Sequence, residues 1–136
     1  MGLDQYCLVE SPDIEKTDAT GACGGLFPIG PSIGDRAEIG YWRKAYTVND
    51  LICKTLQSYK DLPVDADGYR EDNCVDMRMM LDEIEKILKI AKEEANKPIK
   101  SEWEHEDWVN TVEVMTKARR ILQQDPEAKI YYFIWY

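Results

Sequence analysis

Apolar residues recur at intervals of three and four along three stretches of the chain, which is the spacing of one face of an α-helix. The first stretch predicts a helix from about Tyr41 to Tyr59. The second predicts a helix that is capped by Asp72 or Asn73 and stops at Lys97-Pro98, and the third predicts a helix over residues 104–124. The pattern therefore predicts three amphipathic helices.

Two shorter apolar runs lie near the ends of the sequence and lack helical spacing. The first is Tyr6-Cys7-Leu8-Val9; the second, residues 129–136, is rich in aromatic and β-branched residues, and both are typical of strands. An apolar strand whose edge is left unpaired promotes aggregation, so we expect the two strands to pair and to be covered by helices or by a second subunit. The predicted fold is α+β, a single domain over residues 1–136 with three helices packed on a small antiparallel sheet formed by the N- and C-terminal strands.

The segment between the first strand and the first helix is dense in residues that break helices. The breakers are Pro12, Gly21, Gly24, Gly25, Pro28, Gly30, Pro31 and Gly34. They predict a long loop over about residues 10–37, with a short strand around Leu26 and Phe27. Loops of this length are often lids or binding loops, and a segment that is merely mobile fits the composition equally well.

The chain is strongly acidic, with 17 basic and 26 acidic side chains and a formal net charge of -9. A field of this sign repels phosphate backbones, so we expect no direct binding to nucleic acid. The clusters of acidic residues are Asp65, Asp67, Glu71 and Asp72 with Asp61 and Asp76, and Glu102, Glu104, Glu106 and Asp107. Such clusters are either solvated surface or docking surfaces for a basic partner, and the first is the predicted partner-binding surface.

Metal sites find little support in the sequence. Asp65-Ala66-Asp67-Gly68 resembles part of an EF-hand loop with its glycine at the sixth position. That register puts Pro63 first and Cys74 twelfth, where the strongest ligands are needed. His105 is the single histidine, and its acidic neighbours in a helix point in different directions. We therefore predict no metal and no cofactor.

Nucleophilic catalysis is also weakly supported. The four cysteines are irregularly spaced and include no C-x-x-C pair, so we interpret them as free thiols. Cys74 is the best nucleophile candidate, because it lies just ahead of the second predicted helix and a helix N-terminus lowers a thiol pKa. The serines lack a G-x-S-x-G elbow. The sequence thus predicts no catalytic residue.

The stretch Tyr41-Trp42-Arg43-Lys44 is the most distinctive in the sequence, because it sets two aromatic rings beside two cations. At the start of a helix, unpaired N–H groups, a guanidinium and an ammonium suit a phosphate, while one of the two rings stacks on a base. The alternative is structural: Trp42 anchors the helix to the core, and Arg43 pairs with Asp4 or Glu38. On the first interpretation, the ligand-binding residues are Tyr41, Trp42, Arg43, Lys44 and Asp4.

The same stretch carries a family resemblance. Met1-Gly2-Leu3-Asp4-Gln5-Tyr6 and Glu38-Ile39-Gly40-Tyr41-Trp42-Arg43-Lys44-Ala45 resemble a family of small, mostly phage-encoded proteins that open with Met-Gly-Leu-Asp-x-Tyr and later carry Gly-Tyr-Trp-Arg-Lys-Ala. The resemblance implies a phage accessory protein and leaves its mechanism open. The sequence shows no secretory signal and no apolar run of the roughly 20 residues that span a bilayer. We therefore expect the protein in the cytoplasm of the host bacterial cell, with no membrane partner.

Small phage accessory proteins often neutralise host defences by binding, and no catalytic set is evident in this sequence. We therefore expect a non-enzymatic counter-defence protein whose partner is a host defence protein or a phosphorylated nucleotide signal held by the Tyr41–Lys44 motif. One alternative is an acidic nucleic-acid mimic that inhibits a host nuclease, as anti-CRISPR and anti-restriction proteins do. A second alternative is a small nucleotide-processing enzyme. The oligomeric state stays open, a homo-oligomer included.

Overall fold

The computed structural model describes residues 2–10 and 36–136 of the chain. The elements run in the order β1 (Asp4–Glu10), β2 (Arg36–Arg43), α1 (Tyr46–Thr55), α2 (Gln57–Lys60), β3 (Met77–Met79), α3 (Leu81–Ala95), α4 (Glu102–Gln124) and β4 (Lys129–Trp135). The predicted strand around Leu26 and Phe27 lies outside the described residues. The two ends of the predicted loop over 10–37 belong to strands instead, because Glu10 closes β1 and Arg36 opens β2.

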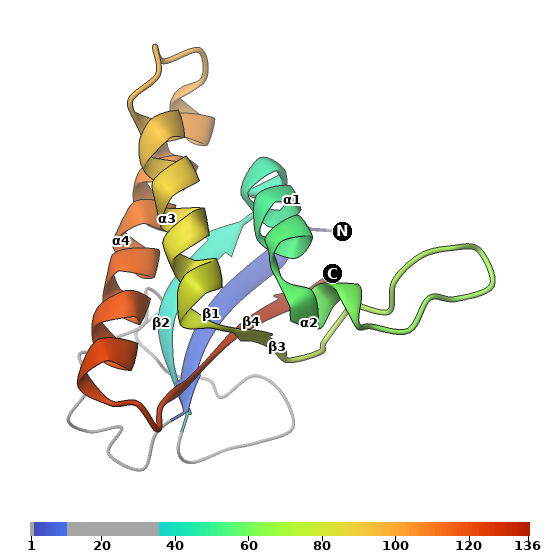
Figure 1. Ribbon diagram of the computed structural model, residues 1–136. Coiled ribbons are helices and arrows are strands. Elements are labelled where there is room, and N and C mark those ends of the chain that lie inside the picture. Colours follow the sequence, from blue (N-terminus) through green and yellow to red (C-terminus); the bar gives the residue numbers. More distant parts are fainter. Residues whose placement is uncertain (1, 11–35) are drawn as a thin grey trace.

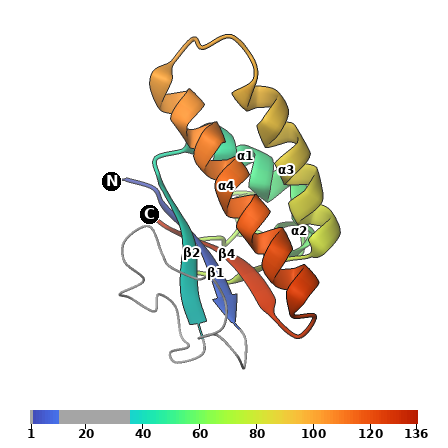
Figure 2. The same ribbon diagram turned by 90° about the vertical axis from the view of Figure 1, so that its left-hand side faces the viewer.

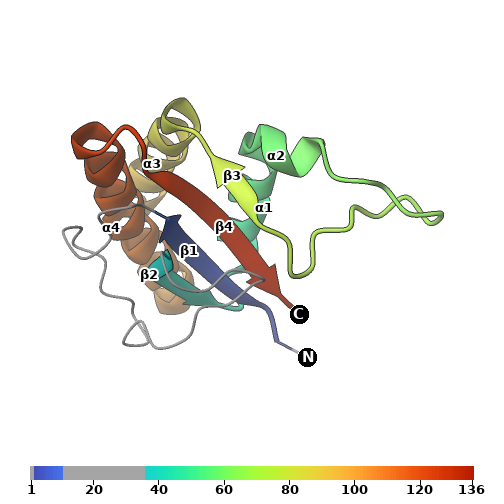
Figure 3. The same ribbon diagram turned by 90° about the horizontal axis from the view of Figure 1, so that it is seen from below.

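In the described part of the chain, four strands form one antiparallel sheet in the order β2-β1-β4-β3, which can be followed in Figure 3. β1 and β4 pair along their length, with Tyr6 opposite Phe133, which confirms that the N- and C-terminal strands meet. α1, α3 and α4 cover one face of this sheet (Figures 1 and 2). The antiparallel α+β class is confirmed, and the sheet is wider than predicted because β2 and β3 extend it at its two edges.

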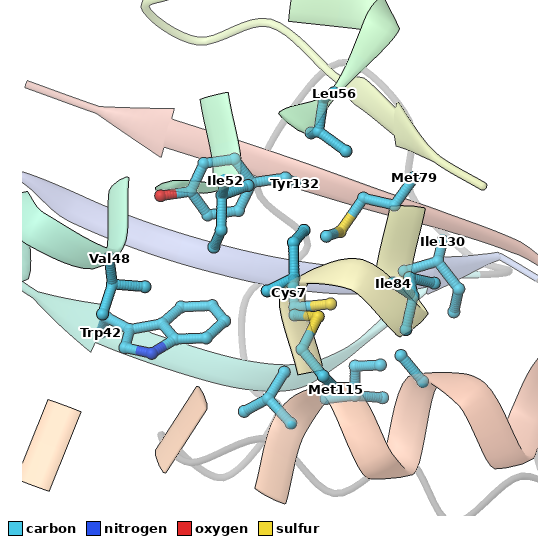
Figure 4. Packing of buried hydrophobic residues seen from close by; sticks show 14 of the residues in the cluster. Cys7, Trp42, Val48, Ile52, Leu56, Met79, Ile84, Met115, Ile130 and Tyr132 are labelled. Atoms are coloured by element: carbon cyan, nitrogen blue, oxygen red, sulfur yellow. The ribbon is translucent and has the colours of Figure 1, made fainter. Parts of the chain in front are cut away.

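The main core lies between the sheet and these helices (Figure 4). Each helix turns one stripe of apolar side chains inward: Val48 from α1, Ile84 from α3 and Met115 from α4 are almost fully buried. Trp42 and Tyr132 contribute large rings from β2 and β4, and their edge-on contact has a centroid distance of 6.1 Å. Burying an aliphatic side chain such as that of Val48 or Ile84 stabilises the fold by about 1.5–3 kcal/mol.

A second, smaller apolar cluster lies on the opposite face of the sheet. Tyr6, Leu8 and Phe133 are buried in it, and Tyr41 and Tyr131 pack against them. Successive side chains of a strand point to opposite faces, so β1 is buried on both sides. This explains why its sequence is a continuous apolar run and does not alternate with polar residues.

The predicted helix over 41–59 is wrong at its start, since β2 extends to Arg43 and α1 begins only at Tyr46. It is also interrupted near its end, because the extended backbone of Leu56 separates α1 from the short α2, so the described residues hold four helices where three were predicted. Gly40 is a strand residue that lets α4 approach closely: a Cβ built on it would lie 2.5 Å from both γ-carbons of Val114. The pairing with β1 shifts between Cys7 and Leu8, which marks a β-bulge in this part of the pair. Trp42 therefore reaches the core from a strand.

The predicted second helix is wrong in its first part as well. Met77–Met79 form β3, α3 begins at Leu81, and neither Asp72 nor Asn73 caps it. The N-terminus is held by Glu83, whose Oε1 accepts a 2.9 Å hydrogen bond from the Met80 N–H. The other carboxylate oxygen accepts the Gln57 N–H at the start of α2 at 2.7 Å, so one buried side chain serves two helices.

The third predicted helix is confirmed, because α4 spans Glu102–Gln124 and differs from the prediction only by two residues at its start. Ser101 caps it by accepting the Glu104 N–H, and the helix ends before Asp125-Pro126. The C-terminal strand is confirmed as β4. Among the helices of residues 2–10 and 36–136, none combines the length and the apolar composition that a membrane span requires.

Candidate functional site

The Tyr41–Lys44 segment is divided between the two faces of the sheet. Tyr41 lies on the face of the sheet opposite α1, α3 and α4, where its hydroxyl donates a 2.6 Å hydrogen bond to Asp4 Oδ1. Trp42 points into the main core with 2% of its surface exposed, and its Nε1–H donates to Thr111 Oγ1 at 3.0 Å. Trp42 is therefore unable to stack on a ligand, and the core-anchor interpretation describes its position.

The two cations of the segment, in contrast, are exposed. Lys44 adopts a left-handed backbone conformation with φ 54°, and its N–H donates to the Leu3 carbonyl at 2.7 Å. Neither Arg43 nor Lys44 forms an ion pair with any residue in the part of the chain that the structure describes. They are available to a ligand, although the start of α1 lies further along the chain than the sequence predicted.

The backbone N–H of Ala45, at the turn that leads into α1, is already hydrogen-bonded to Gln5, a buried side chain that sequence reasoning missed. Gln5 Oε1 accepts the Ala45 N–H at 2.9 Å, and its amide nitrogen donates to the Tyr132 hydroxyl at 2.8 Å. Tyr132 in turn donates to Asn49 Oδ1 at 2.7 Å, and burial raises the pKa of Tyr132 well above its ordinary value. The network joins β1, β4 and α1, and it leaves the turn poorly suited to hold a phosphate through backbone N–H groups.

The predicted acidic surface occupies a projecting loop, residues 61–76, which we call the arm (Figure 1). Asp65 organises its tip: Oδ1 accepts the N–H groups of Asp67 and Tyr69, both at 2.9 Å. Gly68 takes the positive φ of 86° that the turn needs. Tyr69 is 72% exposed, so the arm presents a ring as well as carboxylates to its surroundings.

Arg70 fixes the base of the arm. Its Nη1 donates to the carbonyls of Lys60 and Leu62, at 2.9 and 3.2 Å, and its guanidinium lies 5.5 Å from the centroid of the Tyr59 ring. Asp76, at the other end of the arm, pairs with Arg36 of β2 at 2.8 Å. The remaining carboxylates of the arm form no ion pair within residues 2–10 and 36–136.

A cavity of about 820 Å³ opens between the arm and the C-terminal residue. Its lining includes the carboxylates of Asp65, Glu71 and Asp72, the rings of Tyr59, Tyr69 and Tyr136, and Arg70. A second cavity of about 380 Å³ lies beside α1 and is lined by Leu3, Tyr46, Asn49, Asp72, Ile134 and Tyr136. Asp72 and Tyr136 line both cavities, so this pair is the wall between them.

That wall is closed by a short hydrogen bond from the Tyr136 hydroxyl to Asp72 Oδ1. The hydrogen bond to Asp72, together with desolvation, raises the pKa of Tyr136 to about 12. The Tyr136 N–H also donates to Asn73 Oδ1 at 2.9 Å, which ties the end of the chain to the arm. Within the described residues, the second oxygen of Asp72 accepts no hydrogen bond.

The thiols give little support to catalysis. Cys7, Cys53 and Cys74 are free, as predicted, while Cys23 lies outside the described residues. Burial raises the pKa of Cys7 and of Cys53 to about 12, which suppresses the thiolate at neutral pH. Cys74 is exposed, but it precedes β3 and not a helix, so the predicted activation by a helix N-terminus is wrong. In the described part of the chain, no group of histidine, cysteine and carboxylate side chains is arranged to hold a metal ion.

Comparison of the chain with protein-family models, with curated proteins and with solved structures found no match. Of the predicted residues, Asp4 and Tyr41 lie together, Trp42 is separated from them, and Asp65, Glu71 and Asp72 meet at one cavity, with Asp67 outside its lining. The tyrosines of that cavity were not anticipated.

Proposed function

We propose that this chain is a non-enzymatic binding protein that holds a positively charged surface of another protein on its arm. One observation carries the proposal: exposed carboxylates and rings project from the body around a cavity. Aromatic side chains are enriched at the centres of protein interfaces, and charges around them steer and select the partner.

The sign of the charge on the arm decides between classes of ligand. Asp65, Glu71 and Asp72 line the cavity against one cation of the lining, Arg70, whose Nη1 donates to backbone carbonyls. Such a cavity repels the phosphates of a nucleotide and attracts lysine and arginine side chains. The arm therefore supports the protein-binding hypothesis better than capture of a nucleotide signal.

The resemblance to phage-encoded proteins suggests a setting for this activity. In that setting the partner is a host defence protein, such as a nuclease, with a basic groove that ordinarily receives nucleic acid. The carboxylates of the arm then stand where phosphates would lie, and inhibition is stoichiometric. Turnover of a nucleotide by the wild-type protein would contradict this proposal and favour an enzyme.

The test compares two charge reversals of equal size. Asp67→Lys with Glu71→Lys changes the arm, and Glu102→Lys with Glu106→Lys changes the acidic start of α4 by the same net charge. Binding to immobilised poly-lysine at physiological salt, followed by surface plasmon resonance, should be lost in the arm variant and largely kept in the α4 variant. Equal loss in both would show that the binding follows net charge alone and would overturn the proposal.

A second candidate function, capture of a phosphorylated nucleotide signal, is kept because of one observation. Arg43 and Lys44 are adjacent and exposed, with the Tyr41–Asp4 pair beside them on the sheet and no ion pair to neutralise them among the described residues. Calorimetry against a panel of nucleotides tests it. Heat of binding that disappears in Arg43→Ala with Lys44→Ala would favour this candidate over the arm.

A further inference from the structure

We infer that Asp72 is the anchor for an arginine side chain of the protein partner, and that Tyr136 occupies this anchor until the partner arrives. The inference rests on the proposed function and names the part of the arm that makes the specific contact. The partner's guanidinium takes the place of the Tyr136 hydroxyl, enters between the two cavities and converts their shared wall into a channel.

The position of Asp72 supports this assignment. It is half-buried, it lines both cavities, and of its two carboxylate oxygens only Oδ1 accepts a hydrogen bond from a described residue, the Tyr136 hydroxyl. A carboxylate with one unoccupied oxygen is able to accept a guanidinium in the paired geometry in which two N–H groups meet two oxygens. A phenol gives a single hydrogen bond, so the exchange favours the guanidinium.

The surroundings already hold one guanidinium against an aromatic ring. Arg70 lies over the Tyr59 ring and donates to two backbone carbonyls at the edge of the same cavity. Tyr69 and Tyr136 provide two further rings that no cation covers in the described residues. A cation that enters next to them is stabilised by the ring faces as well as by the carboxylate.

The second cavity explains why arginine suits the site. Leu3 and Ile134 line it beside Asn49 and offer apolar surface to the methylene stem of a long side chain. The planar guanidinium stacks on rings and binds a carboxylate at two points, whereas an ammonium is a strongly hydrated point charge. The occupant is therefore a protein segment that presents arginine, and lysine is the weaker substitute.

The binding experiment uses a fluorescently labelled hexa-arginine peptide, followed by fluorescence anisotropy at physiological salt. A hexa-citrulline peptide, which keeps the shape of arginine without its charge, should not bind. Asp72→Asn should lower the affinity for hexa-arginine by about fivefold, because the charge-assisted contact is lost. Tyr136→Phe should raise it by about twofold, because the phenyl ring remains while the competing hydroxyl is gone.

Glu106→Gln provides the matched control, since it removes one exposed carboxylate far from the arm in sequence and should change the affinity little. If Asp72→Asn and Glu106→Gln weaken binding equally, the inference fails. The proposed function survives that result when the Asp67 and Glu71 reversal still abolishes poly-lysine binding, and it fails as well when that reversal has no effect.

A measurement on the unmodified chain covers the case in which Tyr136→Phe does not fold. The protein is labelled with ¹³C at the hydroxyl-bearing ring carbon of tyrosine. Hexa-arginine should shift the NMR signal of Tyr136, because the Tyr136 hydroxyl loses its hydrogen bond to Asp72. The signal is assigned in segmentally labelled protein. A Tyr136 signal that stays unchanged at saturating peptide would overturn the inference.

Discussion

The Tyr41–Lys44 segment and the arm differ in a way that was not evident from their sequences. The first is the most distinctive motif of the chain, and its largest side chain, Trp42, is buried in the core. The second is an ordinary acidic stretch, and it surrounds a cavity with carboxylates and rings. A rare combination of residues therefore reports strict packing as readily as it reports a binding site, and accessibility separates the two.

The largest effect is expected from removing the tryptophan of the first region. Trp42→Ala should lower the free energy of unfolding by about 3–5 kcal/mol, because it empties a large volume and leaves Thr111 without its donor. Tyr69→Ala, at the tip of the arm, should change it by less than about 0.5 kcal/mol. Urea unfolding of both variants tests the contrast, and similar losses would mean that the arm belongs to the cooperative core.

Close packing of β2 against α4 predicts the next largest effect. Gly40→Ala should cost about 1–3 kcal/mol, since the new methyl group meets the stiff side chain of Val114. The same substitution should cost clearly less in a Val114→Ala background. The coupling is obtained from a double-mutant cycle of unfolding free energies, and strictly additive effects would show that the two residues are not in contact.

A smaller effect, confined to the arm, is expected for Arg70→Ala. The arm should lose its attachment to the carbonyls of Lys60 and Leu62, while the core keeps its packing. Amide hydrogen exchange of Asp67 and Tyr69 should speed up, with the global free energy of unfolding lowered by no more than about 1 kcal/mol. Unchanged exchange in the arm would contradict the anchoring role of Arg70.

The smallest effect concerns pH. The pKa of Tyr136 is raised to about 12 in the folded protein, above its ordinary value of 10.0, so the unfolded chain releases this proton first. The stabilising contribution is fully present below pH 10 and is lost as the pH rises through 12. The Tyr136 side chain is well exposed, so the free energies of unfolding of wild type and Tyr136→Phe should differ by less than about 1 kcal/mol. This difference should shrink as the pH rises from 10 to 12. Thermal unfolding in alkaline buffers measures it.

Local sequence determines some of these elements and leaves others to tertiary contacts. α4 and β4 were predicted nearly in full, because apolar residues at helical spacing and an uninterrupted apolar run are local signals. β3 was absorbed into the following helix, since Met77 continues the helical spacing of the apolar residues in α3. β2 was missed because Trp42 fits the helical spacing of the residues that follow it, and only pairing with β1 decides in favour of a strand.

The candidate site shows the same limit. The carboxylates of the arm are neighbours in the chain, so their clustering was visible in the sequence. Tyr136 meets Asp72 across 64 positions, and Gln5 meets Tyr132 across 127, distances at which no local pattern operates. The rings that turn an acidic stretch into a candidate binding cavity could therefore be recognised only in the folded chain.

Glu83 gives the arm a direction. Its carboxylate grips the beginnings of both α2 and α3, and the arm leaves the body at Asp61, directly after α2. The Glu83 side chain thus fixes the orientation of α2 relative to α3, and with it the direction in which the arm leaves the body. Glu83→Ala alters no residue that lines the cavity, yet it should release the start of α2 and let the arm change its orientation, so that the cavity loses its defined shape.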